Sequence, residues 1–244
     1  MDPRGDQEGR HQLHHHPRVI SVGRGLLIVF EGGEGAGKST QLRRLAADLA
    51  AAQVAHQCCR EPGGTPLGDR IRELLLHAEH AVEPRAEAAL FVASRAQLVA
   101  TELKPALARG EIVLLDRFLL STYAYQIHGR GLPEAPVRAA NALATDGLVP
   151  DLTLLFVIDP QAGLARAGAR GATDRIERSD AAFHARVADA FSAFTAAAWQ
   201  EAHPECGPIV AIDGTGDEAT VAARVRAVLR ARIPAVATAL EGRA

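Results

Sequence analysis

The sequence has few cysteines, no strong net charge and no long apolar run, and each absence narrows the kind of protein that it encodes. Two of the three cysteines are adjacent, Cys58 and Cys59, and the third is far away at Cys206. That spacing suits neither a disulfide framework nor a closed zinc site. We therefore expect a reducing, cytoplasmic setting.

The formal net charge of -2 and the pI near 6.6 show no excess of positive charge that would indicate a nucleic-acid partner. No segment approaches the roughly 18 consecutive apolar residues of a membrane span, and the N-terminus has no hydrophobic signal region. We expect no nucleic-acid partner and no membrane association. Any anion site must then be built from local groups.

The 244 residues, 48% of them hydrophobic, are enough for the core of one domain of ordinary size. Residues 1–24 carry charges and histidines with little apolar periodicity, which predicts a disordered leader. Its histidine tract could hold a metal, although a tract without carboxylate or cysteine partners more often coordinates nothing. We expect a single domain over residues 25–232 and a tail over residues 233–244.

Short apolar runs alternate with longer stretches of helical period, which is typical of a parallel sheet covered by helices. The predicted strands cover residues 26–31, 56–60, 112–116, 152–158 and 209–213. The predicted helices cover residues 38–52, 67–77, 84–109, 134–144, 161–170, 181–201 and 218–231. The expected fold is α/β, a five-stranded parallel sheet with helices on both faces. Right-handed crossovers would bring the carboxyl ends of the strands to one edge, where ligands bind.

A glycine-rich loop follows the first predicted strand and opens the first predicted helix. It reads Gly32, Gly33, Glu34, Gly35, Ala36, Gly37, Lys38, Ser39, which satisfies the P-loop pattern, and Thr40 comes next. Its N–H groups would hold the phosphates of ATP, with Lys38 reaching the β- and γ-phosphates and the Ser39 hydroxyl facing Mg²⁺. The alternative is a turn without a ligand, in which the glycines would only add to the entropy cost of folding. GTPases, ATPases and small-molecule kinases all share this loop.

The next two predicted strands end in charged motifs that would lie at the same edge. Residues 60–65 read Arg-Glu-Pro-Gly-Gly-Thr after the second strand. Asp116 ends the third, where a carboxylate can hold Mg²⁺ opposite the Ser39 hydroxyl. Arg117 beside it offers a fork of donors for a second phosphate. A surface ion pair or a helix cap is the alternative for Asp116 and Arg117.

Residues 31–40, residues 60–65, the Asp116-Arg117 pair and the Tyr125-Gln126 pair together resemble the bacterial thymidylate kinases in order and spacing. The likeness runs from about residue 25 to residue 231. It implies a P-loop nucleoside monophosphate kinase fold, transfer of the γ-phosphate of ATP to dTMP, Mg²⁺ as cofactor, and a homodimer. By the same resemblance, the residues that bind the acceptor nucleotide are Glu34, Pro62, Arg72, Phe91, Arg95, Arg117, Ser121, Thr122, Tyr125 and Gln126.

The resemblance also assigns roles within this set. Phe91 would stack on thymine and Arg95 would hydrogen-bond its carbonyl edge, and their spacing of four puts both on one helical face. Glu34 would approach the sugar, and Tyr125 would pack where a 2′-hydroxyl would clash. Without the other motifs, Phe91 would be interpreted as core and Arg95 as a solvated charge.

Residues 166–179 resemble the mobile lid of the family. In relatives with a glycine where this chain has Gly35, the catalytic arginine comes from the lid, and Arg170 stands at the matching position. The expected catalytic residues are therefore Lys38, Arg117 and Arg170. Gly168 departs from relatives with an arginine there, and a solvated arginine face is the alternative for the whole segment. Two other functions stay open: another nucleoside monophosphate kinase, and a nucleotide-binding module that transfers nothing.

Overall fold

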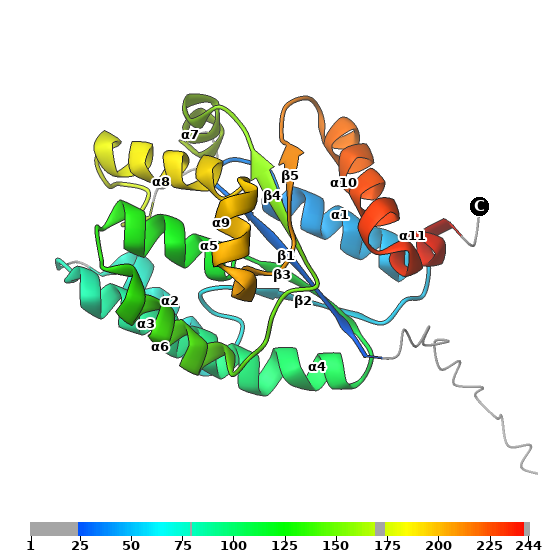
Figure 1. Ribbon diagram of the computed structural model, residues 1–244, viewed down its shortest axis with the longest axis horizontal. Coiled ribbons are helices and arrows are strands. Elements are labelled where there is room, and N and C mark those ends of the chain that lie inside the picture. Colours follow the sequence, from blue (N-terminus) through cyan, green and yellow to red (C-terminus); the bar gives the residue numbers. More distant parts are fainter. Residues whose placement is uncertain (1–23, 79, 169–173, 242–244) are drawn as a thin grey trace, which may run out of the picture.

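Five parallel strands form the centre of the fold, in the order β2-β3-β1-β4-β5. They are β1 (Leu26–Gly32), β2 (His56–Arg60), β3 (Ile112–Asp116), β4 (Leu152–Val157) and β5 (Ile209–Asp213). The computed structural model describes residues 24–78, 80–168 and 174–241 (Figure 1). The predicted α/β fold class is confirmed, because all five predicted strands are present and parallel.

Helices cover both faces of this sheet (Figure 1). One face carries α1 (Lys38–Ala51), α10 (Glu218–Arg232) and α11 (Pro234–Glu241). The elements packed on the other face are α2 (Pro66–His77), α3 (Pro84–Leu98), the π-helix η1 (Val99–Leu103), α4 (Lys104–Ala108), α5 (Leu119–Thr122), the π-helix η2 (Tyr123–Gly129), α6 (Glu134–Thr145), α8 (Ala181–Ala193), α9 (Ala197–Ala202) and the 3-10 turn η3 (Pro204–Cys206). Helix α7 (Pro160–Gly168) follows β4.

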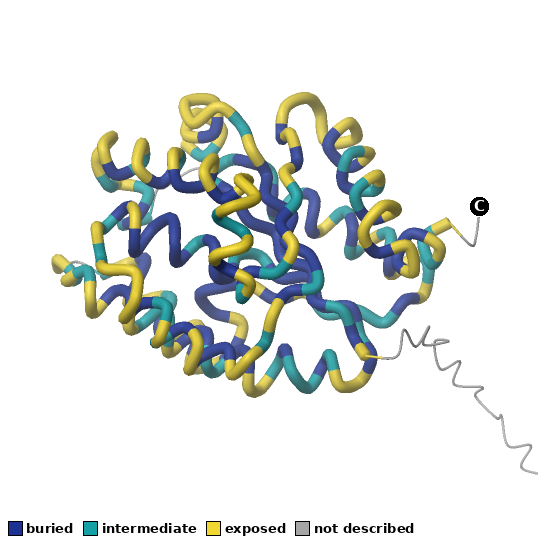
Figure 2. Tube along the Cα trace, viewed as in Figure 1, coloured by how far each residue is buried: buried dark blue, intermediate teal, exposed yellow. Residues whose placement is uncertain are grey.

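Alternating side chains of the central strand belong to two separate cores. Leu27 and Val29 pack into the cluster under α3 and α8, whereas Ile28 and Phe30 pack into the cluster under α1 and α10. This is the period of two that a strand buried on both faces requires. Figure 2 shows the result as a buried sheet between helices that are exposed on their outer sides.

Three segments differ from the secondary structure predicted for them. The predicted helix 84–109 contains a π-helical turn at Val99–Leu103, and the predicted helix 181–201 is broken between Ala193 and Ala197. Residues 119–129 are helical although no helix was predicted there. Their aromatic and β-branched residues have poor helix propensity, and burial of the segment outweighs that preference.

The expected tail over residues 233–244 contains a packed helix. Helix α11 buries Val236 and Ala237 in the same core as α1 and α10. Within the described ranges, no helix is long and apolar enough to cross a membrane.

The carboxyl ends of β1, β2 and β3 meet at one edge of the sheet. The register pairs Phe30 and Arg60 with Asp116 on either side of β3. The loops that follow these three strands therefore share one space.

Candidate active site

A cavity of about 730 Å³ opens where these strand ends meet. The predicted site residues on its wall are Glu34, Gly35, Ala36, Gly37, Lys38, Ser39, Thr40, Pro62, Arg72, Phe91, Arg95, Asp116, Arg117, Ser121, Thr122, Tyr125 and Gln126. Gly32 ends β1, and Gly33 lines a smaller cavity of about 100 Å³. Arg170 lies outside the described residues. The sequence motifs of three strands thus come together around one hollow.

Lys38 is held against the backbone of the loop in which it lies. Its Nζ donates to the carbonyl oxygens of Gly32 at 3.0 Å and Gly33 at 2.7 Å. Burial lowers the pKa of Lys38 to about 8, and the positive charge of Arg117 contributes to this shift. Helix α1 begins at Lys38, so its free N–H groups and positive dipole end also face this loop. The region favours an anion.

The tip of the P-loop packs backbone to backbone against α7. A Cβ atom on Gly35 would lie 2.0 Å from the carbonyl oxygen of Gly163, and a Cβ on Gly163 would lie 2.5 Å from that of Glu34. Only glycines allow this approach. Helix α7, which leads into residues 169–173, is thereby tied to the shape of the P-loop.

Asp116 and Ser39 form an oxygen-rich corner of the cavity. The Ser39 hydroxyl donates to Asp116 Oδ2 at 2.6 Å. The other carboxylate oxygen, Oδ1, is buried and has no hydrogen-bond partner among the described residues. Such an orphaned oxygen beside a hydroxyl fits a hard cation such as Mg²⁺.

Arg117 lies between the P-loop and the helices of the opposite wall. Its backbone is left-handed, with φ of 68°. The guanidinium donates to Gly32 O at 3.2 Å, to Ser121 Oγ at 3.1 Å and to the Glu34 carboxylate. Burial alone would lower the pKa of Arg117, but nearby negative charge, Glu34 first, outweighs it and raises the pKa. Tyr125 completes the group by donating its hydroxyl to Glu34 at 2.8 Å.

Glu31 is a site residue that sequence reasoning missed. Its fully buried carboxylate accepts from the N–H of Phe118 at 2.7 Å and from the N–H and hydroxyl of Ser121 at 3.0 and 2.7 Å. It thereby fixes the turn that carries Arg117. The sequence pattern that could have identified Glu31 is a carboxylate near the end of an apolar strand, the same pattern that identified Asp116.

Arg95 has all five of its N–H donors engaged within the protein. Glu61 accepts from Nε at 2.8 Å and from Nη2 at 2.6 Å, and the Phe118 carbonyl accepts from Nη2 at 2.8 Å. Nη1 donates to Thr122 Oγ1 at 2.9 Å and to Asn141 Oδ1. The Arg95 side chain is only 2% exposed. A hydrogen bond from Arg95 to a base would require one of these five bonds to be exchanged.

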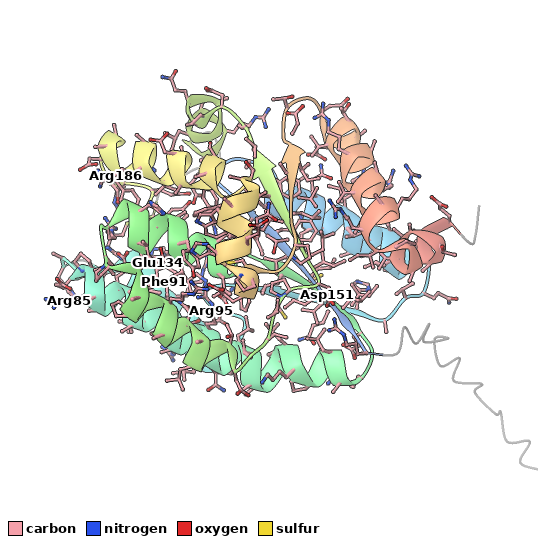
Figure 3. The ribbon with its side chains drawn as sticks, in the orientation of Figure 1. Arg85, Phe91, Arg95, Glu134, Asp151 and Arg186 are labelled. Atoms are coloured by element: carbon pink, nitrogen blue, oxygen red, sulfur yellow. The ribbon has the colours of Figure 1, made fainter. Side chains whose placement is uncertain are left out.

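Phe91 lies one turn before Arg95 on α3, and Figure 3 labels both. It is partly buried against the core and lines the cavity. Glu87, one further turn back, is 1% exposed and accepts hydrogen bonds from Gln126, Arg130 and Arg175. Glu87 precedes Phe91 by the same four residues that separate Phe91 from Arg95, so all three lie on one face of α3. The sequence could therefore have indicated that Glu87 faces the same site.

Glu61 and Asn141 are further residues that sequence reasoning missed. Both accept hydrogen bonds from Arg95, and Glu61 lies inside the Arg-Glu-Pro-Gly-Gly string. Burial raises the pKa of Glu61, although Arg95 opposes the shift. Asn141 comes from α6, and nothing in its sequence surroundings marks it.

The described part of the predicted lid also reaches the cavity. Asp174, Ile176 and Glu177 line it, and so does Ala167. Arg175 donates through Nε to the Leu75 carbonyl at 2.8 Å, which anchors this segment to α2.

Comparisons with known proteins agree on one family. The family model for thymidylate kinase matches residues 30–201. A thymidylate kinase of Deinococcus radiodurans is 46% identical over 211 residues, covering 86% of this chain and 99% of that protein. One from a Synechococcus strain is 47% identical over 209 residues, covering 86% and 96%. The crystal structure of thymidylate kinase from Ehrlichia chaffeensis superimposes with a TM-score of 0.66 at 29% identity, covering 85% of this chain and 99% of that one. With its strand ends, P-loop and cavity arranged as described above, the chain belongs to the thymidylate kinase family.

Proposed function

We propose that this chain transfers the γ-phosphoryl group of ATP to the 5′-phosphate of dTMP, giving dTDP and ADP. The observation that carries the proposal is the continuous cavity that joins the P-loop, at Lys38 and Ser39, to a pocket walled by Phe91 and Gln126. Arg117 lies between the two ends. An enzyme that brings two anionic nucleotides together needs this arrangement, because fixed cations must offset the repulsion between the phosphates.

The residues assigned to ATP are those of the P-loop, from Gly32 to Thr40. Their backbone N–H groups would surround the phosphates, as P-loops do. Lys38 would give up its two loop carbonyls for the β- and γ-phosphates, a short movement for a side chain already at the cavity wall. Arg117 and Arg170 would share the charge of the moving phosphoryl group with Lys38. The role of Arg170 stays a prediction from the resemblance.

The metal assignment depends on the corner formed by Asp116 and Ser39. The orphaned Oδ1 of Asp116 and the Ser39 hydroxyl are the groups that would hold Mg²⁺, with phosphate oxygens completing its shell. When bound, the metal would neutralise charge on the transferring phosphate and orient it. Among the described residues, no group of three His, Cys, Asp or Glu side chains could hold a metal by itself, which agrees with a site completed by nucleotide.

The acceptor residues are those on the far wall of the cavity. Phe91 would stack on the base, while Ser121, Thr122 and Gln126 would line its edge. Arg72 donates to the Pro62 carbonyl at 2.9 Å, and both residues line the cavity. The Arg72 guanidinium would bind the acceptor phosphate, and Pro62 would border the acceptor. Glu34 and Tyr125 would border the sugar. The nucleophile is already an anionic phosphate oxygen, so the transfer needs no general base.

We also propose a cytoplasmic homodimer. Leu74 on α2 is 54% exposed, and Leu143 on α6 is 83% exposed. A second copy would cover such leucines. Sedimentation at micromolar concentration should give twice the chain mass, and a monomer would contradict the dimer. The three free cysteines agree with a reducing compartment.

ATP affinity should fall above pH 8, because the pKa of Lys38 is lowered to about 8. Below this pH the amine is charged in the free protein, and binding requires no proton. Above it the amine must take up a proton to meet the phosphates, so the dissociation constant should rise by up to tenfold per pH unit. Calorimetry from pH 7.5 to 9.5 in two buffers of different ionisation enthalpy measures both the affinity and the proton uptake. A flat profile with no uptake would contradict this role of Lys38.

Gly163→Ala should weaken ATP binding about tenfold without unfolding the protein. The added methyl group would lie 2.5 Å from the Glu34 carbonyl and displace the P-loop, whereas alanine itself favours a helix. Gly168→Ala is the matched control, since a Cβ there meets nothing within 4 Å. Fluorescent-nucleotide titration of both variants makes the comparison, and equal affinities would show that the contact with α7 does not shape the loop.

A coupled assay of ADP release tests the proposed function. The protein is given Mg-ATP with dTMP, dUMP, dCMP or AMP in turn. ADP should form fastest with dTMP and to a lesser extent with dUMP, because the missing methyl group is worth only about 1–3 kcal/mol. Faster ADP release with AMP or dCMP would indicate a different nucleoside monophosphate kinase. ATP binding without acceptor-dependent turnover would indicate a module that transfers nothing.

A further inference from the structure

Gln126 presents an amide of fixed orientation to the cavity. Its Nε2 donates to Glu87 Oε1 at 3.2 Å, and the residue lines the cavity wall. An ionised carboxylate only accepts hydrogen bonds, so the amide nitrogen must face Glu87 and the amide oxygen must face away. Within the described residues, no protein group donates to that oxygen.

The charge state of Glu87 is set by two arginines. Arg130 donates to it through Nε and Nη2, each at 3.1 Å, and Arg175 donates through Nη2 at 2.6 Å. Burial by itself would raise the pKa of Glu87, but these hydrogen bonds outweigh it and lower the pKa. Glu87 is therefore ionised at neutral pH, and it cannot donate a proton to a flipped Gln126.

Most polar groups beside Gln126 already use their donors and acceptors in hydrogen bonds within the protein. Arg95 has all five donors engaged. Ser121 Oγ donates to Glu31 and accepts from Arg117. The Thr122 hydroxyl accepts from Arg95 and can still donate. The amide of Gln126 has a free acceptor, and its second N–H is a donor beside it.

We propose that Glu87 is a specificity-determining positioning residue, which holds the Gln126 amide so that the pocket reads the imide edge of the acceptor base. Gln126 Oε1 accepts from the base N3–H, and its second N–H donates to the adjacent base carbonyl. Cytosine presents the reverse pattern, an acceptor at N3 and an amino donor at C4. Binding cytosine in this way requires the flipped amide, whose oxygen would face the Glu87 carboxylate. The inference rests on the proposed function, because it places a pyrimidine monophosphate in this pocket.

Glu87→Gln should allow the Gln126 amide to flip. Glu87 Oε2 receives one N–H from each arginine, whereas Oε1 receives Arg130 Nε and Gln126. The oxygen of the new amide will therefore remain at Oε2, where it keeps the bonds from Arg130 Nη2 and Arg175 Nη2. Its NH₂ will replace Oε1, at the cost of the hydrogen bond from Arg130 Nε. That NH₂ favours Gln126 in the flipped orientation, which matches cytosine.

The test compares kcat/KM for dTMP, dUMP and dCMP in the wild-type protein and in Glu87→Gln. The ratio of dTMP to dCMP should fall at least tenfold, because a buried hydrogen-bonding site discriminates strongly against the wrong pattern. The ratio of dTMP to dUMP should stay within about twofold, because both bases share the imide edge. A merely structural role for Glu87 would lower all three activities and leave both ratios unchanged.

Two further variants keep the test decisive if Glu87→Gln folds poorly. Glu87→Gln/Arg175→Gln keeps the net charge of the cluster and should show the same loss of discrimination, measured by calorimetric binding of dTMP and dCMP.

Glu205→Gln is the matched control, since Glu205 accepts from Tyr123 and Arg138 away from the cavity, and its ratios should equal those of the wild type. Unchanged ratios in both Glu87 variants would overturn the inference and leave the function standing. A wild-type protein that prefers dCMP would instead overturn the proposed function.

Discussion

Arg117→Ala is expected to lower kcat/KM for dTMP about a thousandfold while the protein stays folded. The guanidinium bridges the Gly32 carbonyl, Ser121 and the Glu34 carboxylate, so its loss removes a cation from between the two nucleotides. Cations that neutralise a transferring phosphoryl group are worth roughly 10³–10⁵ in rate. The variant also removes the ion pair between Arg117 and Glu34, so the negative charge of Glu34 is no longer offset by Arg117 beside the phosphates. Steady-state kinetics with both substrates varied, together with a thermal unfolding curve, measures the effect.

Two comparisons separate charge from geometry at this position. Arg117→Lys keeps the charge but loses the planar fork, and it should recover only part of the rate. Arg226→Ala removes an arginine that pairs with Asp48 on the opposite face of the sheet, and it should leave the kinetics unchanged. If Arg117→Ala turned over at near wild-type speed, Arg117 would have no place in the transfer step.

Asp116→Asn is expected to lower kcat on the order of a hundredfold and to shift the Mg²⁺ dependence to higher concentration. The amide oxygen can still accept from Ser39, so the local fold is preserved. The buried oxygen Oδ1 is replaced by an NH₂ group, which repels a cation instead of ligating it. Titration of activity with Mg²⁺ at fixed ATP gives both quantities.

Asp213→Asn is the matched control for this change. Asp213 also ends a strand, β5, but it is exposed and pairs with Arg224 outside the cavity. Its Mg²⁺ dependence should equal that of the wild type. An unaltered Mg²⁺ dependence in Asp116→Asn would remove Asp116 from the metal site.

The strands and the P-loop were predictable because local patterns determine them. Strands β2, β3 and β5 begin and end at the predicted residues, since each is a short apolar run bounded by polar or turn residues. The convergence of the loops after β1, β2 and β3 followed from the parallel topology alone. The P-loop residues from Glu34 to Thr40, Asp116 and Arg117, which share one cavity, could therefore be named from their motifs and their places at the strand ends, whereas Arg72, Phe91 and Arg95 were named only from the resemblance.

The direction of individual side chains could not be obtained in the same way. Arg95 was predicted to face a base, yet its guanidinium is enclosed by Glu61, Thr122 and Asn141, the last from a helix distant in sequence. Its direct contact with a base stays a prediction. The roles of Glu31 and Glu87 depend on tertiary hydrogen bonds, and the sequence shows only their places at a strand end and on a helix stripe.

Helix continuity also depends on tertiary packing. The helix breaks after Ala193, and Phe194 is fully buried. The ring centroids of Phe194 and Trp199 are 4.3 Å apart. Sequence propensity over 181–201 favours one continuous helix, and aromatic packing outweighs it. Helix α11 was missed for a related reason, because its stability comes from the apolar face it buries under α1 and α10.

The central claim is that one cavity holds a triphosphate and a monophosphate with their phosphates facing each other across Lys38 and Arg117. A compound that joins adenosine to thymidine through a chain of phosphates tests it directly, by competition against each substrate in turn. The account predicts competition with both ATP and dTMP, and binding at least a hundredfold tighter than either nucleotide alone. Competition with only one of them, at the affinity of that nucleotide, would contradict a shared cavity.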